Sequence, residues 1–282
     1  MIAVLGATGR QGGAVLRALV DAGRPVRAVV RDPESPSAVA LAESGIPLAV
    51  ADLADVDSLT RAFEAASSVF AVTTPFENGT QAEEEQGEAI IEAADRAAIS
   101  HLVLSSVASA QRGTGIPHFQ SKAHIEHVLA ATDLPATVVA PTAFYDNVLN
   151  SLDQIADGRM PLALPPDKPL QQVSRQDLGQ VVAAVTAEPT RWIGQRIEIA
   201  GDEPSPSAMA AAISRAGHGV VRHHQVELEE LRDNPDMYAM FRFLSEQGYS
   251  VNIPRLRDLF PEITWTSFAE WAMSRQWPVP RP

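Results

Sequence analysis

Hydrophobic residues in the first half of the chain fall into short apolar runs that alternate with longer segments of helical periodicity. Short apolar runs are typical of buried strands, and apolar residues spaced three or four apart are typical of helices. Strands are expected at residues 2–5, 25–30, 46–50, 68–72, 101–105 and 136–140. Helices are expected from about residue 12, at 37–43, after 52, and at 80–97 and 119–130. This alternation predicts a doubly wound parallel sheet with helices on both faces.

The rhythm loosens after Pro141, where prolines cluster at 161, 165, 166 and 169, and again at 204 and 206. Strands are expected at 171–173 and 195–200, and helices after Asp177 and at 207–216, 236–248 and 267–276. The sequence therefore predicts a first domain at 1–150 and a smaller α/β lobe at 151–282. No clean linker separates them. The lobe would close over a ligand and form a substrate pocket.

The first strand breaks into a glycine-rich turn that leads directly into a helix. Glycines stand at positions 6, 9 and 12. A strand that turns through glycines onto a helix N-terminus can bind a pyrophosphate through backbone N–H groups and the helix dipole. The G-x-x-G-x-x-G spacing is one residue off the G-x-G-x-x-G of dinucleotide dehydrogenases. We therefore predict a Rossmann-like nucleotide site, rather than a purely structural turn, that involves Gly6, Thr8, Gly9, Arg10, Gln11 and Gly12.

The end of the second strand bears on the choice of nucleotide. An acidic residue there accepts from the adenosine ribose of NAD, whereas an arginine favours the 2′-phosphate of NADP. The chain has Arg31 followed by Asp32, and Arg10 in the glycine turn could reach the same phosphate. NADP(H) is the preferred prediction and NAD(H) the alternative, in which Arg31 is solvated and Asp32 takes the ribose.

Two further strand ends carry candidate cofactor contacts. Asp52 and Leu53 follow the third strand, where an aspartate can accept from the adenine amino group and a leucine can pack on the ring. Asp52 and Asp55 could equally cap the next helix. Thr73 and Thr74 follow the fourth strand and are candidates for the cofactor ribose and phosphates.

Composition narrows the class of protein. The 282 residues carry a net charge of −13 and no cysteine. This argues against direct binding to nucleic acid or an anionic membrane, and against disulfides, thiol nucleophiles and cysteine-ligated metals. No apolar stretch approaches the roughly 18 residues of a membrane span. His124 and His127 would be half a metal site with no third ligand, so no metal is expected. We expect a cytoplasmic monomer or homodimer.

These segments together resemble the NmrA-like proteins of the atypical short-chain dehydrogenase/reductase superfamily. The residues that carry the resemblance are Gly6–Gly12, Val30-Arg31-Asp32-Pro33, Ala51-Asp52-Leu53, His118-Phe-Gln-Ser-Lys122, Ala140 to Asn147 and Arg175-Gln-Asp-Leu-Gly179. They cover nearly the whole chain in the expected order. The resemblance implies NAD(P)(H) binding, but the family contains both small-molecule reductases and redox-sensing regulators.

The segment from His118 to Lys122 bears most on catalysis. Short-chain dehydrogenases use Tyr-x-x-x-Lys, which places a lysine one helical turn from the proton-donating tyrosine. Here histidine stands at the tyrosine position. Lys122 could hold the nicotinamide ribose or act as an acid or base, as a lysine at this place does in the related isoflavone-reductase-like enzymes. His118 could shuttle a proton or face solvent, and Ser105 could polarise a substrate carbonyl or be structural.

Aromatic residues after the sixth strand are candidate pocket residues. By resemblance, Phe144, Tyr145 and Asn147 would line the substrate pocket, with Phe144 also contacting the cofactor. The alternative is that the two aromatic rings belong to the core. Two functions remain open: an NADP(H)-dependent oxidoreductase acting on a small carbonyl, quinone or conjugated alkene, and a non-catalytic NADP(H) sensor that regulates a protein partner.

Overall fold

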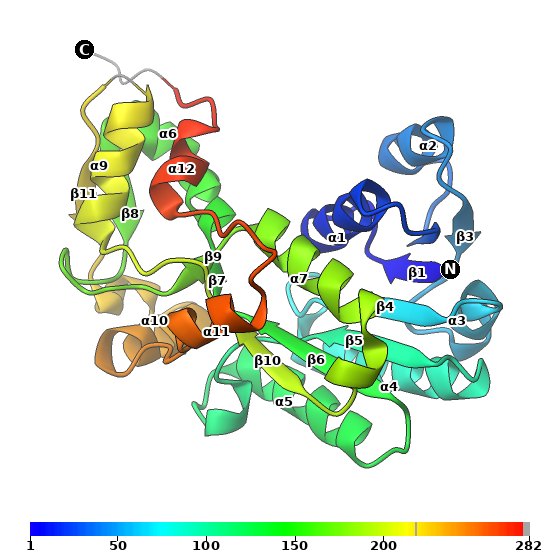
Figure 1. Ribbon diagram of the computed structural model, residues 1–282. Coiled ribbons are helices and arrows are strands. Elements are labelled where there is room, and N and C mark those ends of the chain that lie inside the picture. The colour runs from blue at the N-terminus through cyan, green and yellow to red at the C-terminus, as the bar shows by residue number, and fades with distance from the viewer. Residues whose placement is uncertain (218, 279–282) are drawn as a thin grey trace. The chain divides into compact units, whose positions relative to one another are not determined.

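The centre of the fold is a seven-stranded parallel sheet in the order β10-β6-β5-β4-β1-β2-β3. The computed structural model describes residues 1–217 and 219–278. The strands are β1 (Ile2–Leu5), β2 (Val26–Val30), β3 (Leu48–Val50), β4 (Ser68–Val72), β5 (His101–Ser105), β6 (Ala136–Pro141) and β10 (Arg196–Ile199). The predicted doubly wound α/β fold is confirmed (Figure 1).

Helices cover both faces of this sheet, with α1 and α7 on one side and α4 and α5 on the other (Figure 1). Their bounds are α1 (Arg10–Asp21), α2 (Pro36–Glu43), α3 (Val56–Phe63), α4 (Gly79–Arg96), α5 (Pro117–Ala130), α7 (Arg175–Ala187) and α8 (Pro189–Trp192). A 3-10 turn, η1 (Ala110–Arg112), precedes α5. A Cβ at Gly179 would lie 2.7 Å from the Ala14 carbonyl oxygen, so glycine allows α7 to approach α1 closely.

The strand β10 corrects one prediction. The sequence placed residues 195–200 in the smaller lobe, but β10 is the seventh strand of the main sheet. The Val138 N–H donates to the Gln195 carbonyl, and the Thr142 N–H donates to that of Ile199. The sheet to which a strand belongs depends on pairing with residues distant in sequence, and the local hydrophobic pattern does not indicate these partners.

The chain forms two compact units that are interleaved in sequence. The first comprises Met1–Gly113, His118–Ala140 and Leu178–Glu198. The second comprises Thr114–Pro117, Pro141–Asp177 and the residues from Ile199 onward. The sheet therefore recruits α7 and β10 from the second half of the chain.

The second unit contains small two-stranded sheets and short helices. They are β7 (Ala143–Phe144), η2 (Tyr145–Ser151), α6 (Leu152–Ala156), β8 (Arg159–Leu162), β9 (Gln172–Val173), α9 (Pro206–Gly217), β11 (Arg222–Gln225), η3 (Leu228–Leu231), α10 (Pro235–Glu246), α11 (Ile253–Leu259) and α12 (Phe268–Met273). β7 pairs with β9, and β8 with β11. An aromatic core forms around Tyr145, Phe268 and Trp271, whose ring centroids lie 5.4–5.8 Å apart.

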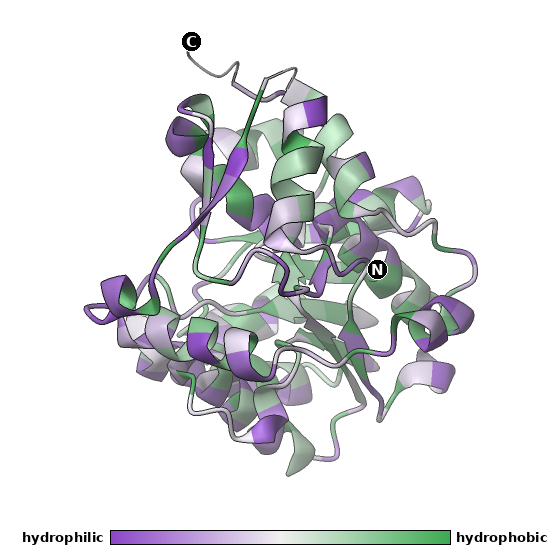
Figure 2. Ribbon diagram, turned by 90° about the vertical axis from the view of Figure 1, so that its left-hand side faces the viewer, coloured by the Kyte–Doolittle hydropathy of each residue, from purple (hydrophilic) through white to green (hydrophobic). Residues whose placement is uncertain are grey.

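Hydrophobic residues concentrate in the strands of the main sheet, whereas polar residues are more frequent in the helices and loops around it (Figure 2). The cluster that joins the sheet to α3, α4 and α5 includes Phe63, Ile90 and Leu102, all fully buried. In the part of the chain that the structure describes, no helix is long and apolar enough to cross a membrane.

Candidate active site

The candidate site lies at the carboxyl edge of the main sheet. β1 has β4 on one side and β2 on the other, so the chain winds in opposite directions from this point. Ligands of open α/β sheets bind at the strand ends next to such a switch point. Three adjacent strands carry candidate residues at their carboxyl ends. Gly6 directly follows β1, Thr73 directly follows β4, and Ser105 and Ser106 lie at the end of β5.

The glycine turn is compact and leads straight into α1. Gly6 has a φ of +62°, and its carbonyl accepts from the Gly9 N–H at 2.8 Å. A Cβ at Gly12 would lie 2.2 Å from the Gly6 carbonyl oxygen, so only glycine fits there. Gly9 precedes α1 and has no side chain to accept from the first helical N–H groups, which lack intrahelical acceptors. Thr8, Gly9 and Arg10 are exposed.

Two predicted site residues meet at this edge. The Ser105 hydroxyl donates to the Gln11 side-chain carbonyl at 3.0 Å, which joins the end of β5 to the first turn of α1. Ser105 itself is buried. The bond gives the hydroxyl a structural partner and holds it beside the glycine turn.

Lys122 lies in a buried polar cluster with Thr73, Glu83 and Ser121, which we call the lysine cluster. Its ammonium is 2.9 Å from the Thr73 carbonyl oxygen, from the Thr73 hydroxyl and from Glu83 Oε1. The Thr73 hydroxyl donates to Glu83 Oε1 at 3.0 Å, and the Ser121 hydroxyl donates to Glu83 Oε2 at 2.5 Å. An ammonium has three N–H donors, so these contacts can use all of them.

Burial and charge act in opposite directions on Lys122. Its side chain is 11% exposed and that of Glu83 is 0% exposed. Burial lowers the pKa of Lys122 from its ordinary value, and the nearby Glu83 carboxylate opposes that shift without cancelling it. The amine is therefore a more available proton donor than an exposed lysine.

Glu83 is the residue that the sequence reading missed. The acidic composition of the run from Glu83 to Glu92 predicts a solvated helix face, but Glu83 is fully buried and faces Lys122. The correction has a signal in the sequence: Glu83 shares a helical face with Gly87 and Ile90, at i+4 and i+7, and both are buried.

His118, at the tyrosine position of short-chain dehydrogenases, is half-buried at the start of α5. Its ring centroid lies 5.6 Å from that of Phe76 and 4.8 Å from that of Phe119. Phe76 is 70% exposed and lies in the loop after β4, where its N–H donates to the Thr74 hydroxyl. Phe76 was not among the predicted residues.

The residues expected to select the nucleotide lie at the end of β2. Arg31 is exposed and its guanidinium is 3.6 Å from the Glu77 carboxylate, in the loop after β4. Asp32 is also exposed, and one of its two carboxylate oxygens accepts from the Glu34 N–H at 2.9 Å. Both residues at the end of β2 are therefore exposed, so the structure leaves both choices of nucleotide open.

Asp52 and Leu53 follow β3. Asp52 is exposed, and its carboxylate accepts from the Ala54 N–H at 2.9 Å within a tight turn. Asp55 is the cap of α3, since it accepts from the Asp57 and Ser58 N–H groups. Leu53 packs against the core cluster. Of the two aspartates considered as helix caps, Asp55 caps α3, and Asp52 stays a candidate for contact with the adenine amino group.

The candidate substrate residues belong to the second unit. Tyr145 is fully buried, and its hydroxyl donates to the Thr266 carbonyl at 2.9 Å. Burial raises its pKa, so this phenol is a poor proton donor at neutral pH, and the geometry favours the core interpretation. Phe144 is half-buried, and the Arg175 guanidinium carbon lies 4.8 Å from the centroid of the Phe144 ring. Asn147 is exposed.

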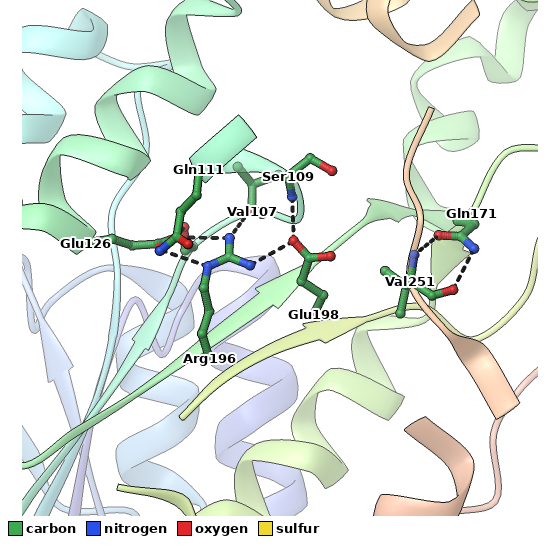
Figure 3. A network of polar contacts seen from close by, with 9 residues as sticks. Val107, Ser109, Gln111, Glu126, Gln171, Arg196, Glu198 and Val251 are labelled. Atoms are coloured by element: carbon green, nitrogen blue, oxygen red, sulfur yellow. Dashed lines mark hydrogen bonds and ion pairs between the residues drawn. The ribbon is translucent and has the colours of Figure 1, made fainter. Parts of the chain in front are cut away.

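A second polar network fixes the loop after β5, and we call it the arginine cluster (Figure 3). It comprises Ser106, Gln111, Glu126, Arg196 and Glu198, with backbone groups of Val107 and Ser109. Arg196 Nε is 2.8 Å from Glu126 and its Nη1 is 2.8 Å from Glu198, while Nη2 donates to the Val107 carbonyl. The loop beside Ser105 is thereby tied to α5 and β10.

Comparison with known proteins gives the family. The profile of the NmrA-like family matches residues 1–272. A (4-alkanoyl-5-oxo-2,5-dihydrofuran-3-yl)methyl phosphate reductase of Streptomyces griseus is 30% identical, with 82% of this chain and 77% of that protein covered. The nitrogen metabolite repression protein nmrA of Emericella nidulans is also 30% identical, with 83% and 70% covered.

A solved structure of similar fold is that of the Citrobacter sp. triphenylmethane reductase complexed with NADP(H). Its TM-score is 0.81 at 22% identity, and 96% of this chain and 98% of that chain are covered. The predicted resemblance is confirmed over nearly the full length. The chain belongs to the NmrA-like family.

Proposed function

We propose that this protein binds NADP(H) and reduces a small carbonyl, quinone or conjugated alkene. The observation that carries the proposal is Lys122, a buried ammonium whose pKa is lowered. Lys122 contacts Thr73, which directly follows β4, and the glycine turn directly follows the neighbouring strand β1. The reductase among the relatives and the NADP(H)-bound reductase of similar fold support it.

The residues present fit a dinucleotide. The glycine turn holds a helix N-terminus at the end of β1, and the contact between Gly12 and Gly6 leaves no room for a side chain in it. Such a turn can take a pyrophosphate. Arg31, with Arg10 as a second cation, would favour the 2′-phosphate of NADP, whereas NAD remains the alternative because Glu77 already pairs with Arg31.

When bound, the nicotinamide would supply the hydride. Lys122 would donate to the ribose or to the substrate oxygen, after one of its contacts with Thr73 gives way. Ser105, held by Gln11, would act on the substrate oxygen if its hydroxyl exchanges that partner. His118 is a candidate proton relay, and Phe144 and Asn147 are candidate pocket residues.

The second candidate function is a nucleotide sensor that binds NADP(H) without turnover and regulates a protein. Two observations favour it. The usual tyrosine is replaced by His118, and the regulator nmrA is as similar to this chain as the phosphate reductase, at 30% identity.

The test follows NADPH oxidation with a panel of quinones, enones and aldehydes, alongside fluorescence titration of NADPH and NADH. Lys122→Ala should lower substrate-dependent oxidation by at least about a hundredfold, the usual contribution of an acid–base group. Lys168→Ala is the matched control, since Lys168 is the other lysine of the chain. Circular dichroism of each variant checks the fold.

The outcomes separate the two functions. Turnover that collapses only in Lys122→Ala supports the reductase. Tight NADPH binding with no oxidation above background across the panel supports the sensor. Failure of the wild-type protein to bind either nucleotide contradicts both.

A further inference from the structure

Glu83 is a buried carboxylate with a complete set of partners from three parts of the chain. It is fully buried, it comes from α4, and it contacts Lys122 of α5 together with the hydroxyls of Thr73 and Ser121. A buried carboxylate is costly unless it is paired and hydrogen-bonded. Here both of its oxygens are engaged and its charge is matched by one ammonium.

The choice of lysine rather than arginine at position 122 is also informative. The chain has 22 basic residues of which only two are lysines, Lys122 and Lys168. Arginine is otherwise used throughout, yet the buried position on α5 carries a lysine. An ammonium on a flexible stem can exchange hydrogen-bond partners one at a time, which a guanidinium fork does less readily.

We propose that Glu83 is a positioning residue for Lys122: it is the buried counter-ion that keeps the amine charged and directed at Thr73 until a ligand hydroxyl replaces one Thr73 contact. The proposal rests on the proposed function only in naming that hydroxyl as one of the nicotinamide ribose. Lys122 then acts as a charged hydrogen-bond donor rather than as a neutral base.

Other charged groups near Lys122 do not replace Glu83. Glu126 lies one turn further along α5 and raises the pKa of Lys122 less than Glu83 does. Its carboxylate is itself paired with Arg196 of β10. His118 precedes Lys122 by one turn on α5, and from the loop after β4 the neighbour is the uncharged Thr73.

The test measures the titration of Lys122 directly. Protein labelled with 13C at the lysine ε-carbon gives two NMR signals because the chain has two lysines. In Glu83→Gln the amide keeps the size of the side chain but removes its charge. We expect the midpoint of Lys122 to fall by about one pH unit or more, the usual effect of an opposite charge at this range.

A second readout uses the ligand. The NADPH affinity of Glu83→Gln should match that of the wild type at acidic pH. As the pH rises, the affinity of the variant should begin to weaken at a lower pH than that of the wild type. The difference should be about tenfold in the range where Lys122 has lost its proton only in the variant. Glu85→Gln is the matched control: Glu85 is on the exposed face of α4 and pairs with Gln81. It should leave both the titration and the affinity profile unchanged.

An unchanged Lys122 midpoint in folded Glu83→Gln would overturn the proposal. If that variant does not fold, Glu83→Asp retracts the charge by one methylene and should shift the midpoint in the same direction. An unchanged Lys122 midpoint in Glu83→Asp would also overturn the proposal. Failure of the proposed function is a separate outcome, because the titration needs neither nucleotide nor substrate.

Discussion

Helix α5 contributes to two ionic clusters one turn apart, through Lys122 and Glu126, and the two clusters are built differently. The lysine cluster joins Lys122 to Glu83 with two hydroxyl groups around them. The arginine cluster places Arg196 between Glu126 and Glu198. The first has one cation for one carboxylate, and the second has one cation for two.

The two clusters differ in how readily their cation can exchange a hydrogen-bond partner. Arg196 forms a fixed fork whose N–H groups reach two carboxylates and the Val107 carbonyl, so it ties α5, β10 and the loop after β5 together. Lys122 contacts one threonine twice and one glutamate once. The arginine cluster is suited to holding backbone in place, and the lysine cluster is suited to exchanging a partner with a ligand.

Removing the guanidinium should have the largest effect on stability. In Arg196→Met the buried Glu126 loses its cation, and we expect the free energy of unfolding to fall by about 3–5 kcal/mol. Urea denaturation measures it. Arg196→Lys keeps a charge but not the fork and should lose less. A loss as large in Arg196→Lys as in Arg196→Met would mean that the fork geometry, rather than the charge, stabilises the loop.

The stability of the protein should depend on pH through a buried histidine. His101, on β5, is buried, and burial lowers its pKa to about 4 from 6.5. The unfolded chain therefore binds the proton first as pH falls below about 6.5. Stability is full above that pH and should decrease by about 2 kcal/mol by about pH 5.

His101→Phe isolates this contribution. The Thr137 hydroxyl donates to the Trp192 carbonyl at 2.8 Å, so it keeps a partner without the imidazole. The difference in unfolding free energy between the wild type and this variant should therefore narrow or reverse between neutral pH and about pH 5. Parallel pH profiles would show that folding does not shift the pKa of His101.

The smallest expected effect tests the approach of α4 to α5. Gly87 lies one turn after Glu83, and a Cβ there would come within 2.4 Å of the Ile125 side chain. Gly87→Ala should destabilise by about 1 kcal/mol, because overpacking exceeds the helix-propensity gain and Ile125 can shift partly. Thermal unfolding measures it. A stabilised variant would mean that the helices separate freely, and that the Glu83–Lys122 distance is not set by this contact.

Local pattern was enough to predict most of the fold. The alternation of apolar runs and helical periodicity predicted the strands of the main sheet, and the glycine spacing predicted the turn before α1. Position at a strand end made Thr73 a candidate, and the family resemblance made Lys122 and Ser105 candidates. The fold predictions succeed because strand, helix and turn patterns depend on residues that lie close together in sequence.

Pairings between distant segments required the tertiary structure. The position of β10 beside β6, the contact of Ser105 with Gln11 and the pairing of Arg196 with Glu126 join residues 57 or more positions apart. Tyr145 looks the same in sequence whether it lines a pocket or fills a core, and only its burial distinguishes the two.

The sequence by itself determined the alternating parallel architecture, the glycine turn and the lysine on the helix after β5, because periodicity and spacing are local properties. Only the tertiary structure decided that Glu83 is a buried partner rather than a solvated one. The reason is that burial depends on which helix packs against α4, and Gly87 makes room for Ile125 of α5 at that place.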